Sequence, residues 1–120
     1  MIGFTSAQSY YLSRQPADMR KSFDGLSGLV RQGLGRDPLS GEVFIFFNRR
    51  RTMAKILVWD RSGFVVWSKR LERGTFELPR KTEAGASVVL SWEELVMILE
   101  GVSLGSIRRR KRYSRGKTAA

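Results

Sequence analysis

Five consecutive apolar residues, Val43-Phe44-Ile45-Phe46-Phe47, constrain what this chain can fold into more than any other segment. Neighbouring side chains of an extended strand point to opposite faces of a sheet, so a strand without polar positions is covered on both faces. Turn-forming residues bound the run, with Asp37-Pro38-Leu39-Ser40-Gly41 before it and Asn48-Arg49-Arg50-Arg51-Thr52 after it. The run therefore predicts a central strand of a β-sheet.

Two more strands are predicted directly after this one. Residues 53–59 and 64–71 are rich in apolar and β-branched side chains, and Asp60-Arg61-Ser62-Gly63 between them is typical of a turn. Because short turns join antiparallel neighbours, the three strands should form an antiparallel meander. Weaker alternation at Tyr10 and Leu12, and the short segment 88–90, indicate further strands.

Two helices are predicted beside the sheet. Between residues 18 and 34, apolar side chains recur every three or four positions and so share one helical face: Met19, Phe23, Leu26, Val30 and Leu34. Gly35 can end this helix in the left-handed conformation. A second helix, over about residues 92–101, is predicted by the capping box Ser91-Trp92-Glu93-Glu94.

The expected fold class is α+β. It consists of an antiparallel meander of three to five strands, packed with an N-terminal helix over about 18–34 and a C-terminal helix over about 92–101. A chain of 120 residues with 42% hydrophobic residues is long enough to bury one core, so residues 1–106 are expected to form a single domain. Residues 107–120 contain few apolar groups and are predicted to be a flexible basic tail.

Small residues interrupt the first helix at Ser22, Gly25, Gly28 and Gly33. Glycine inside a helix costs stability relative to alanine, so the glycines at these positions need a structural explanation. The favoured explanation is close packing of the helix on the sheet. The alternative is a groove in which a partner docks.

The two tryptophans of the meander are predicted to lie in the core. If Trp59 pairs with Phe64 across the second turn, Trp67 lies between apolar neighbours such as Ile56 and Phe44. Exposed aromatic rings can instead stack on nucleic acid bases, which is the alternative role for both tryptophans.

The composition argues against an enzyme, because the chain contains neither histidine nor cysteine. These residues are the usual general bases, nucleophiles and metal ligands of small enzymes. The sequence also lacks metal-ligand spacings, a phosphate-binding glycine loop and a nucleophile elbow. No catalytic residue, metal site or cofactor is therefore predicted.

Membrane insertion is not predicted either. No segment approaches the ~18 uninterrupted apolar residues that a membrane-spanning helix needs, and the chain does not start with a basic region followed by an apolar one. The protein is expected in the cytoplasm, and the absence of cysteine agrees with a reducing compartment.

The formal net charge of +11 is concentrated in two clusters. The register that pairs Trp59 with Phe64 also sets Thr52 opposite Leu71, which brings basic residues together at one end of the sheet. These residues of the sheet end are Arg49, Arg50, Arg51, Lys69, Arg70 and Arg73. The second cluster lies in the tail and comprises Arg108, Arg109, Arg110, Lys111 and Arg112.

Both clusters predict contact with a polyanion. Guanidinium groups bind phosphate oxygens in bidentate fashion, and several such contacts release counterions from nucleic acid. Phosphate contacts alone do not distinguish DNA from RNA, and no helix presents an obvious set of base-reading side chains. Solvation of the charges, without a ligand, is the alternative for each cluster.

A string of motifs resembles a known family. The motifs are Asp18-Met19-Arg20-Lys21-Ser22-Phe23-Asp24-Gly25-Leu26, Gly41-Glu42-Val43-Phe44, Asn48-Arg49-Arg50-Arg51-Thr52, Lys55-Ile56-Leu57, Trp59-Asp60, Gly63-Phe64 and Lys69-Arg70-Leu71-Glu72-Arg73-Gly74-Thr75-Phe76. Over roughly residues 4–104 the chain resembles TnpB, the small accessory protein encoded by the second open reading frame of insertion sequence 66 elements. Ser22 departs from the pattern, since glycine is expected there in the family.

The resemblance implies a non-catalytic role in moving a bacterial mobile element, beside a separate transposase. It supplies no catalytic residues. The expected partners are DNA at the element ends and the transposase of the same element. The alternative function is a protein adaptor that docks on the transposase or on a second copy of itself, without touching nucleic acid.

Overall fold

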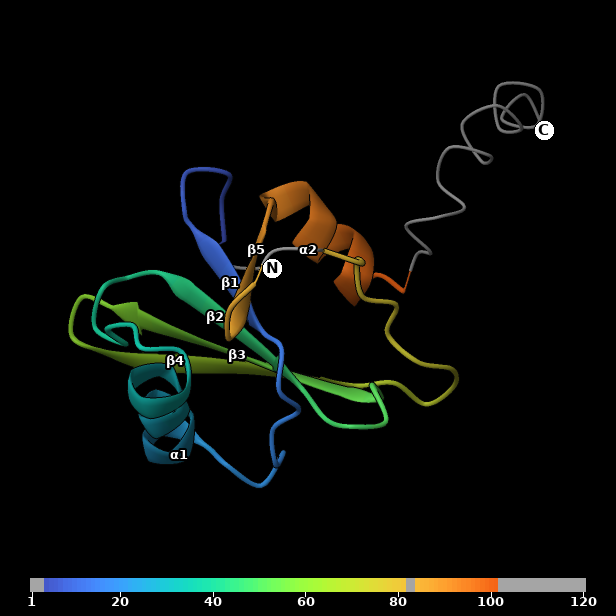
Figure 1. The fold of residues 1–120 in the computed structure, drawn as a ribbon, viewed down its shortest axis with the longest axis horizontal. Coiled ribbons are helices and arrows are strands. Elements are labelled where there is room, and N and C mark those ends of the chain that lie inside the picture. Colours follow the sequence, from blue (N-terminus) through green and yellow to red (C-terminus); the bar gives the residue numbers. More distant parts are fainter. Residues whose placement is uncertain (1–3, 82–83, 102–120) are drawn as a thin grey trace.

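The predicted central strand lies in the middle of a five-stranded sheet in the computed structural model, which describes residues 4–81 and 84–101 (Figure 1). The strands are arranged in the order β4-β3-β2-β1-β5. Their bounds are β1 (Tyr10–Ser13), β2 (Val43–Phe47), β3 (Met53–Asp60), β4 (Gly63–Arg70) and β5 (Ser87–Leu90). All five residues of β2 are buried, as the uninterrupted apolar run predicts.

The antiparallel meander β2-β3-β4 is confirmed, and so is the register of its second hairpin. Trp59 pairs with Phe64, and the backbone N–H of Leu71 donates to the carbonyl of Thr52 at 2.8 Å. The sheet as a whole is mixed, because β1 runs parallel to β2 and antiparallel to β5. A parallel pair needs a long crossover, and the chain between β1 and β2 supplies it with a helix.

The sheet is covered on both faces, which explains why β2 has no polar position. The C-terminal helix α2 (Trp92–Leu99) packs on one face, where its Leu95 and Ile98 join side chains from all of β1, β2, β3 and β5. The N-terminal helix packs on the other face, where Leu26 and Val30 contact Phe44, Phe46 and Leu57. The fold is therefore helix, sheet and helix in three layers.

The two tryptophans of the meander lie on opposite faces of the sheet. Trp67 pairs with Ile56 and packs on the core that α2 covers, as predicted. The expected contact with Phe44 is wrong, because Phe44 belongs to the core under the N-terminal helix. Trp59 is half-buried and its ring packs edge-on against Phe64 at 5.0 Å.

The N-terminal helix starts later than predicted. It consists of α1 (Phe23–Gly28) and a wider turn, η1 (Leu29–Gly33), instead of a helix from residue 18. The carboxylate of Asp18 accepts hydrogen bonds from the backbone and the guanidinium of Arg20, and this local turn competes with the helix. The buried positions Leu26 and Val30 are confirmed, whereas Phe23 is 47% exposed.

The glycines of this helix do not make it pack closely on the sheet, so the favoured explanation is wrong. A methyl group at Gly28 or Gly33 would meet no atom within 4 Å. At Gly25 it would meet the side chain of Lys21, which precedes the helix in the chain and does not belong to the sheet. Gly35, by contrast, has a φ of +63°, so its predicted role at the end of the helix is confirmed.

The predicted capping box at the start of α2 is confirmed. Ser91 Oγ accepts the N–H of Glu94, and the Glu94 carboxylate accepts the N–H of Ser91, both at 3.0 Å. The helix ends at Leu99, two residues before the predicted end. Gly101 follows with a φ of +75°, and its N–H donates to the carbonyl of Ile98.

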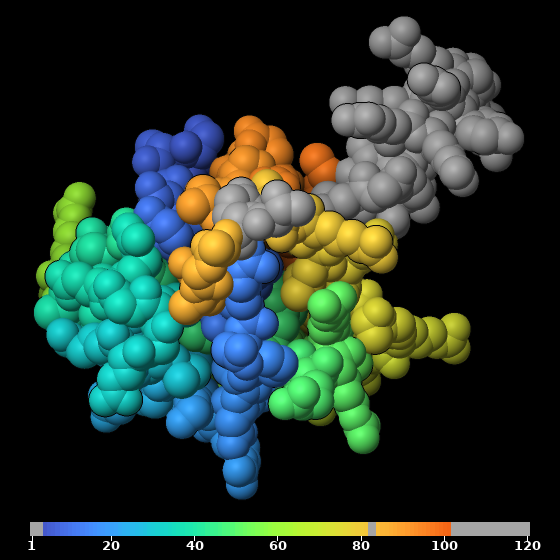
Figure 2. All heavy atoms as spheres, viewed as in Figure 1, coloured from blue at the N-terminus to red at the C-terminus, as the bar shows by residue number. Residues whose placement is uncertain are grey.

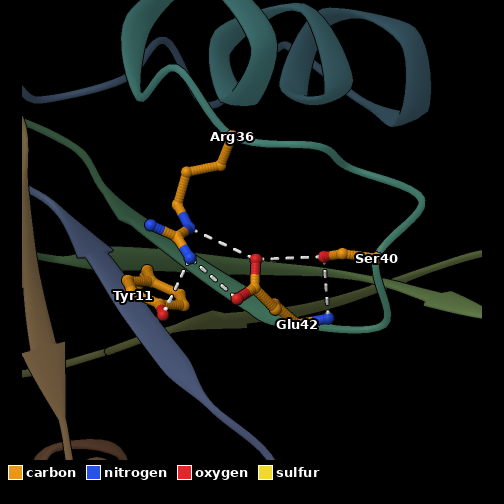
Figure 3. A network of polar contacts seen from close by, with 4 residues as sticks. All are labelled: Tyr11, Arg36, Ser40 and Glu42. Carbon is orange, nitrogen blue, oxygen red and sulfur yellow. Dashed lines mark hydrogen bonds and ion pairs between the residues drawn. The ribbon is translucent and has the colours of Figure 1, made fainter.

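One polar network fastens the crossover to β1 (Figure 3). The guanidinium of Arg36 binds both carboxylate oxygens of Glu42, at 3.2 and 2.9 Å, and also donates to the hydroxyl of Tyr11. Ser40 donates to the same carboxylate at 3.1 Å. The hydrogen bond from Arg36 holds the pKa of Glu42 below its ordinary value, although partial burial opposes the shift.

This network predicts a pH-dependent contribution to stability. Because the pKa of Glu42 is lowered by folding, the contribution is complete above the ordinary value of 4.5 and is lost as the pH falls below it. We expect Glu42→Gln to lower the free energy of unfolding by about 1 kcal/mol at pH 7. Urea denaturation should show that the difference in free energy of unfolding between this variant and the wild type is smaller at pH 3 than at pH 7. An equal difference at both pH values would contradict the prediction.

Candidate nucleic-acid interface

The turn between β2 and β3 presents three consecutive arginines on a fixed backbone. Asn48 Oδ1 accepts the N–H groups of Thr52 and Met53, at 2.8 and 3.0 Å, and Asn48 Nδ2 donates to Thr52 Oγ1. Arg51 adopts a φ of +57° and donates its N–H to the carbonyl of Asn48. The turn is therefore held by its own polar groups, while the side chains of Arg49, Arg50 and Arg51 are exposed.

The segment that follows β4 returns to this turn. The N–H of Phe76 donates to the carbonyl of Arg51 at 2.7 Å. Phe76 itself is 1% exposed, and its ring packs against Phe47 at 5.2 Å. Leu78 and Arg80, which follow in the chain, line a hollow together with Arg51 of the turn.

The chain after β1 lies on the other side of the turn. The N–H of Ala17 donates to the carbonyl of Phe47 at 2.9 Å. Figure 2 shows the turn, in green, between the blue segment that follows β1 and the yellow segment that follows β4. Three segments far apart in the sequence therefore meet at one end of the sheet, and we call this surface the arginine end.

A concavity of about 220 Å³ lies where the turn meets the segment after β1. Three arginines are among the residues that line it: Arg14, Arg49 and Arg51. The described residues that line it include no acid; the others are Ser13, Gln15, Pro16, Phe47, Asn48 and Leu78. Among the described residues that line it, basic side chains thus outnumber acidic ones.

A neighbouring hollow is much less positive. It shares Arg51 and Leu78 with the first one and adds Arg80 and Lys81, but also Glu77 and Glu94. Lys81 is engaged by Glu94, with 3.0 Å between Nζ and Oε2. Among the described lining residues, acidic side chains thus occur in this hollow and not in the concavity.

The basic residues predicted at the sheet end are not equivalent. Arg70 pairs with Glu72 at 3.1 Å, although both side chains are mostly exposed. Arg73 is exposed. Lys69 points to the opposite face from Arg70 and donates from Nζ to the carbonyl of Leu99 at 2.7 Å, where it caps the end of α2.

The second predicted cluster lies outside the described residues. It comprises Arg108, Arg109, Arg110, Lys111 and Arg112.

Sequence reasoning missed Arg14 and Arg80, which the structure brings to the arginine end. Arg14 directly follows a strand, but nothing local to it shows that this strand is parallel to β2 and ends beside the turn.

Two further findings concern the described residues alone. Between residues 4 and 101, except 82 and 83, no three His, Cys, Asp or Glu side chains gather in a way that could hold a metal ion. In the same part of the chain, none of the helices has the length and apolar character needed to cross a bilayer.

The fold and the arginine end define a class: a small α+β protein with an exposed arginine cluster held on a β-hairpin. The chain matches the family described as IS66 Orf2 like protein over residues 8–109, and it belongs to that family. This is the family that the sequence motifs resemble. It is an accessory family of insertion sequences, so the protein is associated with transposition.

Two proteins of Sinorhizobium fredii are similar to this chain. The uncharacterized protein y4jC is 30% identical over 110 residues, which is 92% of each chain. The uncharacterized protein y4hO is 33% identical over 85 residues, covering 71% of this chain and 72% of y4hO. No solved structure matches this chain.

Proposed function

We propose that this protein is a non-catalytic accessory factor that binds duplex DNA near the ends of its insertion sequence and assists the transposase. The observation that carries the proposal is the β2–β3 turn, where Asn48 fixes the backbone and three arginines remain exposed. Rigid donors lose less conformational entropy on binding than donors on a mobile chain. Adjacent guanidinium groups also repel one another, and phosphates relieve this repulsion.

The working site of this proposal is smaller than the set predicted from sequence. It consists of Arg49, Arg50 and Arg51 together with the exposed Arg73, because Lys69 caps α2 and Arg70 has a carboxylate partner. The basic cluster at residues 108–112 adds long-range attraction for the same polyanion. The protein acts in the bacterial cytoplasm, where the element's DNA is found.

The protein-adaptor alternative needs a sizeable exposed apolar patch. The exposed large hydrophobic residues of the described chain are Phe23, Leu39, Val65 and Val89. They come from α1, the crossover, β4 and β5, and Val65 and Val89 lie on opposite faces of the sheet. This scatter favours the nucleic-acid proposal over docking through one apolar surface.

The proposal predicts a steep salt dependence. About five phosphate contacts should give a slope near −4 to −5 when the logarithm of the association constant is plotted against the logarithm of the salt concentration. Fluorescence anisotropy with a 20-base-pair duplex would measure it between about 50 and 300 mM salt. A slope near zero would contradict DNA binding through phosphates. Tighter binding to RNA of equal length would indicate that the ligand is RNA instead of DNA.

A further inference from the structure

We propose that the free edge of β4 pairs antiparallel with β4 of a second copy of this chain, so that two five-stranded sheets join into one sheet of ten strands. β4 stands at one end of the strand order and has a hydrogen-bonded neighbour, β3, on one side only. The two strands pair without interruption from Asp60 with Gly63 to Met53 with Arg70. This inference goes beyond the proposed function and does not depend on DNA binding.

The backbone of β4 directs every second residue away from the sheet. Antiparallel pairs alternate between hydrogen-bonded and non-hydrogen-bonded, and the bond from the N–H of Leu71 to the carbonyl of Thr52 marks their pair as hydrogen-bonded. Counting back in steps of two, the odd-numbered residues of β4 bond to β3. The backbone N–H and C=O groups that point outward therefore belong to Phe64, Val66, Ser68 and Arg70. Among the described residues, no hydrogen bond reaches these outward groups.

β4 lacks most of the features that protect an exposed strand edge from pairing with another chain. Such edges are usually very short, interrupted by proline or a bulge, or lined with charges. The opposite edge of the sheet is protected in this way, because β5 has only four residues. β4 has eight residues and no proline, and its only charged residues, Lys69 and Arg70, stand at one end. The uncharged stretch Gly63–Ser68 is therefore open to another strand.

A second copy of β4 is self-complementary to this edge in one antiparallel register. In this register Trp67 lies opposite Trp67 of the second copy, on the two-fold axis that relates them. Val66 then meets Ser68 of the second copy, and Phe64 meets Arg70, once on each side of the axis. Every outward backbone group is paired in this way. The pairing uses up the long edges of both copies and leaves only the short β5 edges, so the assembly closes as a dimer.

The side chains of β4 agree with this register. Val65 is 46% exposed, although it pairs with Val58 and so shares the face of the sheet that α2 covers. In the dimer, Trp67 of the second copy lies diagonally opposite Val65, within reach of a large aromatic side chain. Pairing therefore covers the one large hydrophobic residue that β4 exposes among the described residues.

The charges favour the antiparallel arrangement over a parallel one. Lys69 lies opposite Val65 of the second copy, so the basic ends of the two strands are kept apart. Parallel pairing would set these ends side by side, and like charges directly opposite one another are destabilising. The β2–β3 turn adjoins the Arg70 end of β4, so antiparallel pairing also places the two arginine ends at opposite ends of the joined sheet.

Sedimentation equilibrium of the full chain tests whether the dimer forms. Salt at about 0.3 M limits the general repulsion between copies that each carry a net charge of +11. Between about 1 and 500 µM protein, we expect a monomer–dimer equilibrium with a dissociation constant in the micromolar range. A chain that stays monomeric at every concentration would overturn the pairing and leave the edge of β4 to an extended segment of another protein. Growth beyond a dimer would also overturn it.

Two lysine substitutions compare the two edges of the sheet. Val65→Lys sets a lysine opposite Lys69 of the second copy at two symmetry-related places, so it should weaken the dimer about tenfold or more. Val89 is a matched control, because it is a 58% exposed valine on the other edge strand, β5. Val89→Lys adds the same charge and should leave the dimer unchanged. Equal effects of the two substitutions would overturn pairing through β4.

Val65→Glu separates the effect of charge from the loss of the valine. It removes the same apolar side chain but sets a carboxylate opposite Lys69 of the second copy, so it should weaken the dimer by only about threefold or less. Equal weakening by Val65→Glu and Val65→Lys would overturn the antiparallel register. Circular dichroism should show that all three variants are folded, since both valines are exposed.

Amide hydrogen exchange tests the backbone pairing directly. In the monomer, the N–H groups of Val66 and Ser68 point away from β3, so exchange at these two amides should slow about tenfold when the protein concentration is raised far above the dissociation constant. Association through another surface leaves both amides free to exchange. Unchanged exchange at Val66 and Ser68 in a sample that is dimeric by sedimentation would therefore overturn the proposal.

Discussion

Replacing Arg49, Arg50 and Arg51 together by alanine is expected to lower affinity for duplex DNA about 10²-fold at 0.15 M salt. Each lost phosphate contact accounts for about a fivefold change at this salt concentration, and three such changes multiply. Transposition of a marked element, with the protein supplied in trans, should fall more than it does when residues 107–120 are deleted. The turn has this larger effect because its donors are held by Asn48.

The control removes three positive charges elsewhere. The control variant carries alanine at three other exposed basic positions, Lys21, Arg31 and Arg61. Its net charge equals that of the variant with alanine at Arg49, Arg50 and Arg51. Arg61 matches Arg51 closely, because it too lies in a β-hairpin turn with a positive φ, +54° against +57°, but at the other end of β3. Circular dichroism should show both triple variants folded. Normal transposition with the folded Arg49, Arg50 and Arg51 variant would exclude the turn as the functional site.

Phe76→Ala is expected to lower the free energy of unfolding by about 3–5 kcal/mol, whereas Phe23→Ala should cost less than about 1 kcal/mol. Phe76 is 1% exposed and packs on Phe47, while Phe23 is 47% exposed on α1. The same substitution therefore leaves a cavity in the core at Phe76, whereas at Phe23 it removes a side chain that is largely exposed to solvent. Urea denaturation of the two variants beside the wild type measures the difference.

This comparison also tests how the arginine end is built. The backbone N–H of Phe76 holds the carbonyl of Arg51, so loosening this segment should weaken DNA binding under conditions where the variant is still folded. Equal destabilisation by the two substitutions would contradict the placement of Phe76 in the core. The periodicity of the sequence alone leads to the opposite expectation for Phe23, which it assigns to the buried face of the helix.

Local patterns in the sequence were sufficient for the parts of the fold that depend on neighbouring residues. The apolar run Val43–Phe47 predicted the central strand, and Ser91 with Glu94 predicted the start of α2, because strand burial and helix capping are decided within a few residues. The hairpin register followed from one turn, since pairing Trp59 with Phe64 fixes every later pair. The arginine turn could be predicted for the same reason.

Only the tertiary structure decided which distant segments complete the arginine end. The alternation at Tyr10 and Leu12 indicates a strand, but pairing of that strand with β2 depends on contacts more than thirty residues apart. The same non-local packing turned Lys69 toward the end of α2 and brought Arg14 to the concavity. The sequence by itself thus determined the strands, the turn and the excess of positive charge, whereas the assembly of the sheet determined which of those charges converge, because convergence is a property of packing and not of local propensity.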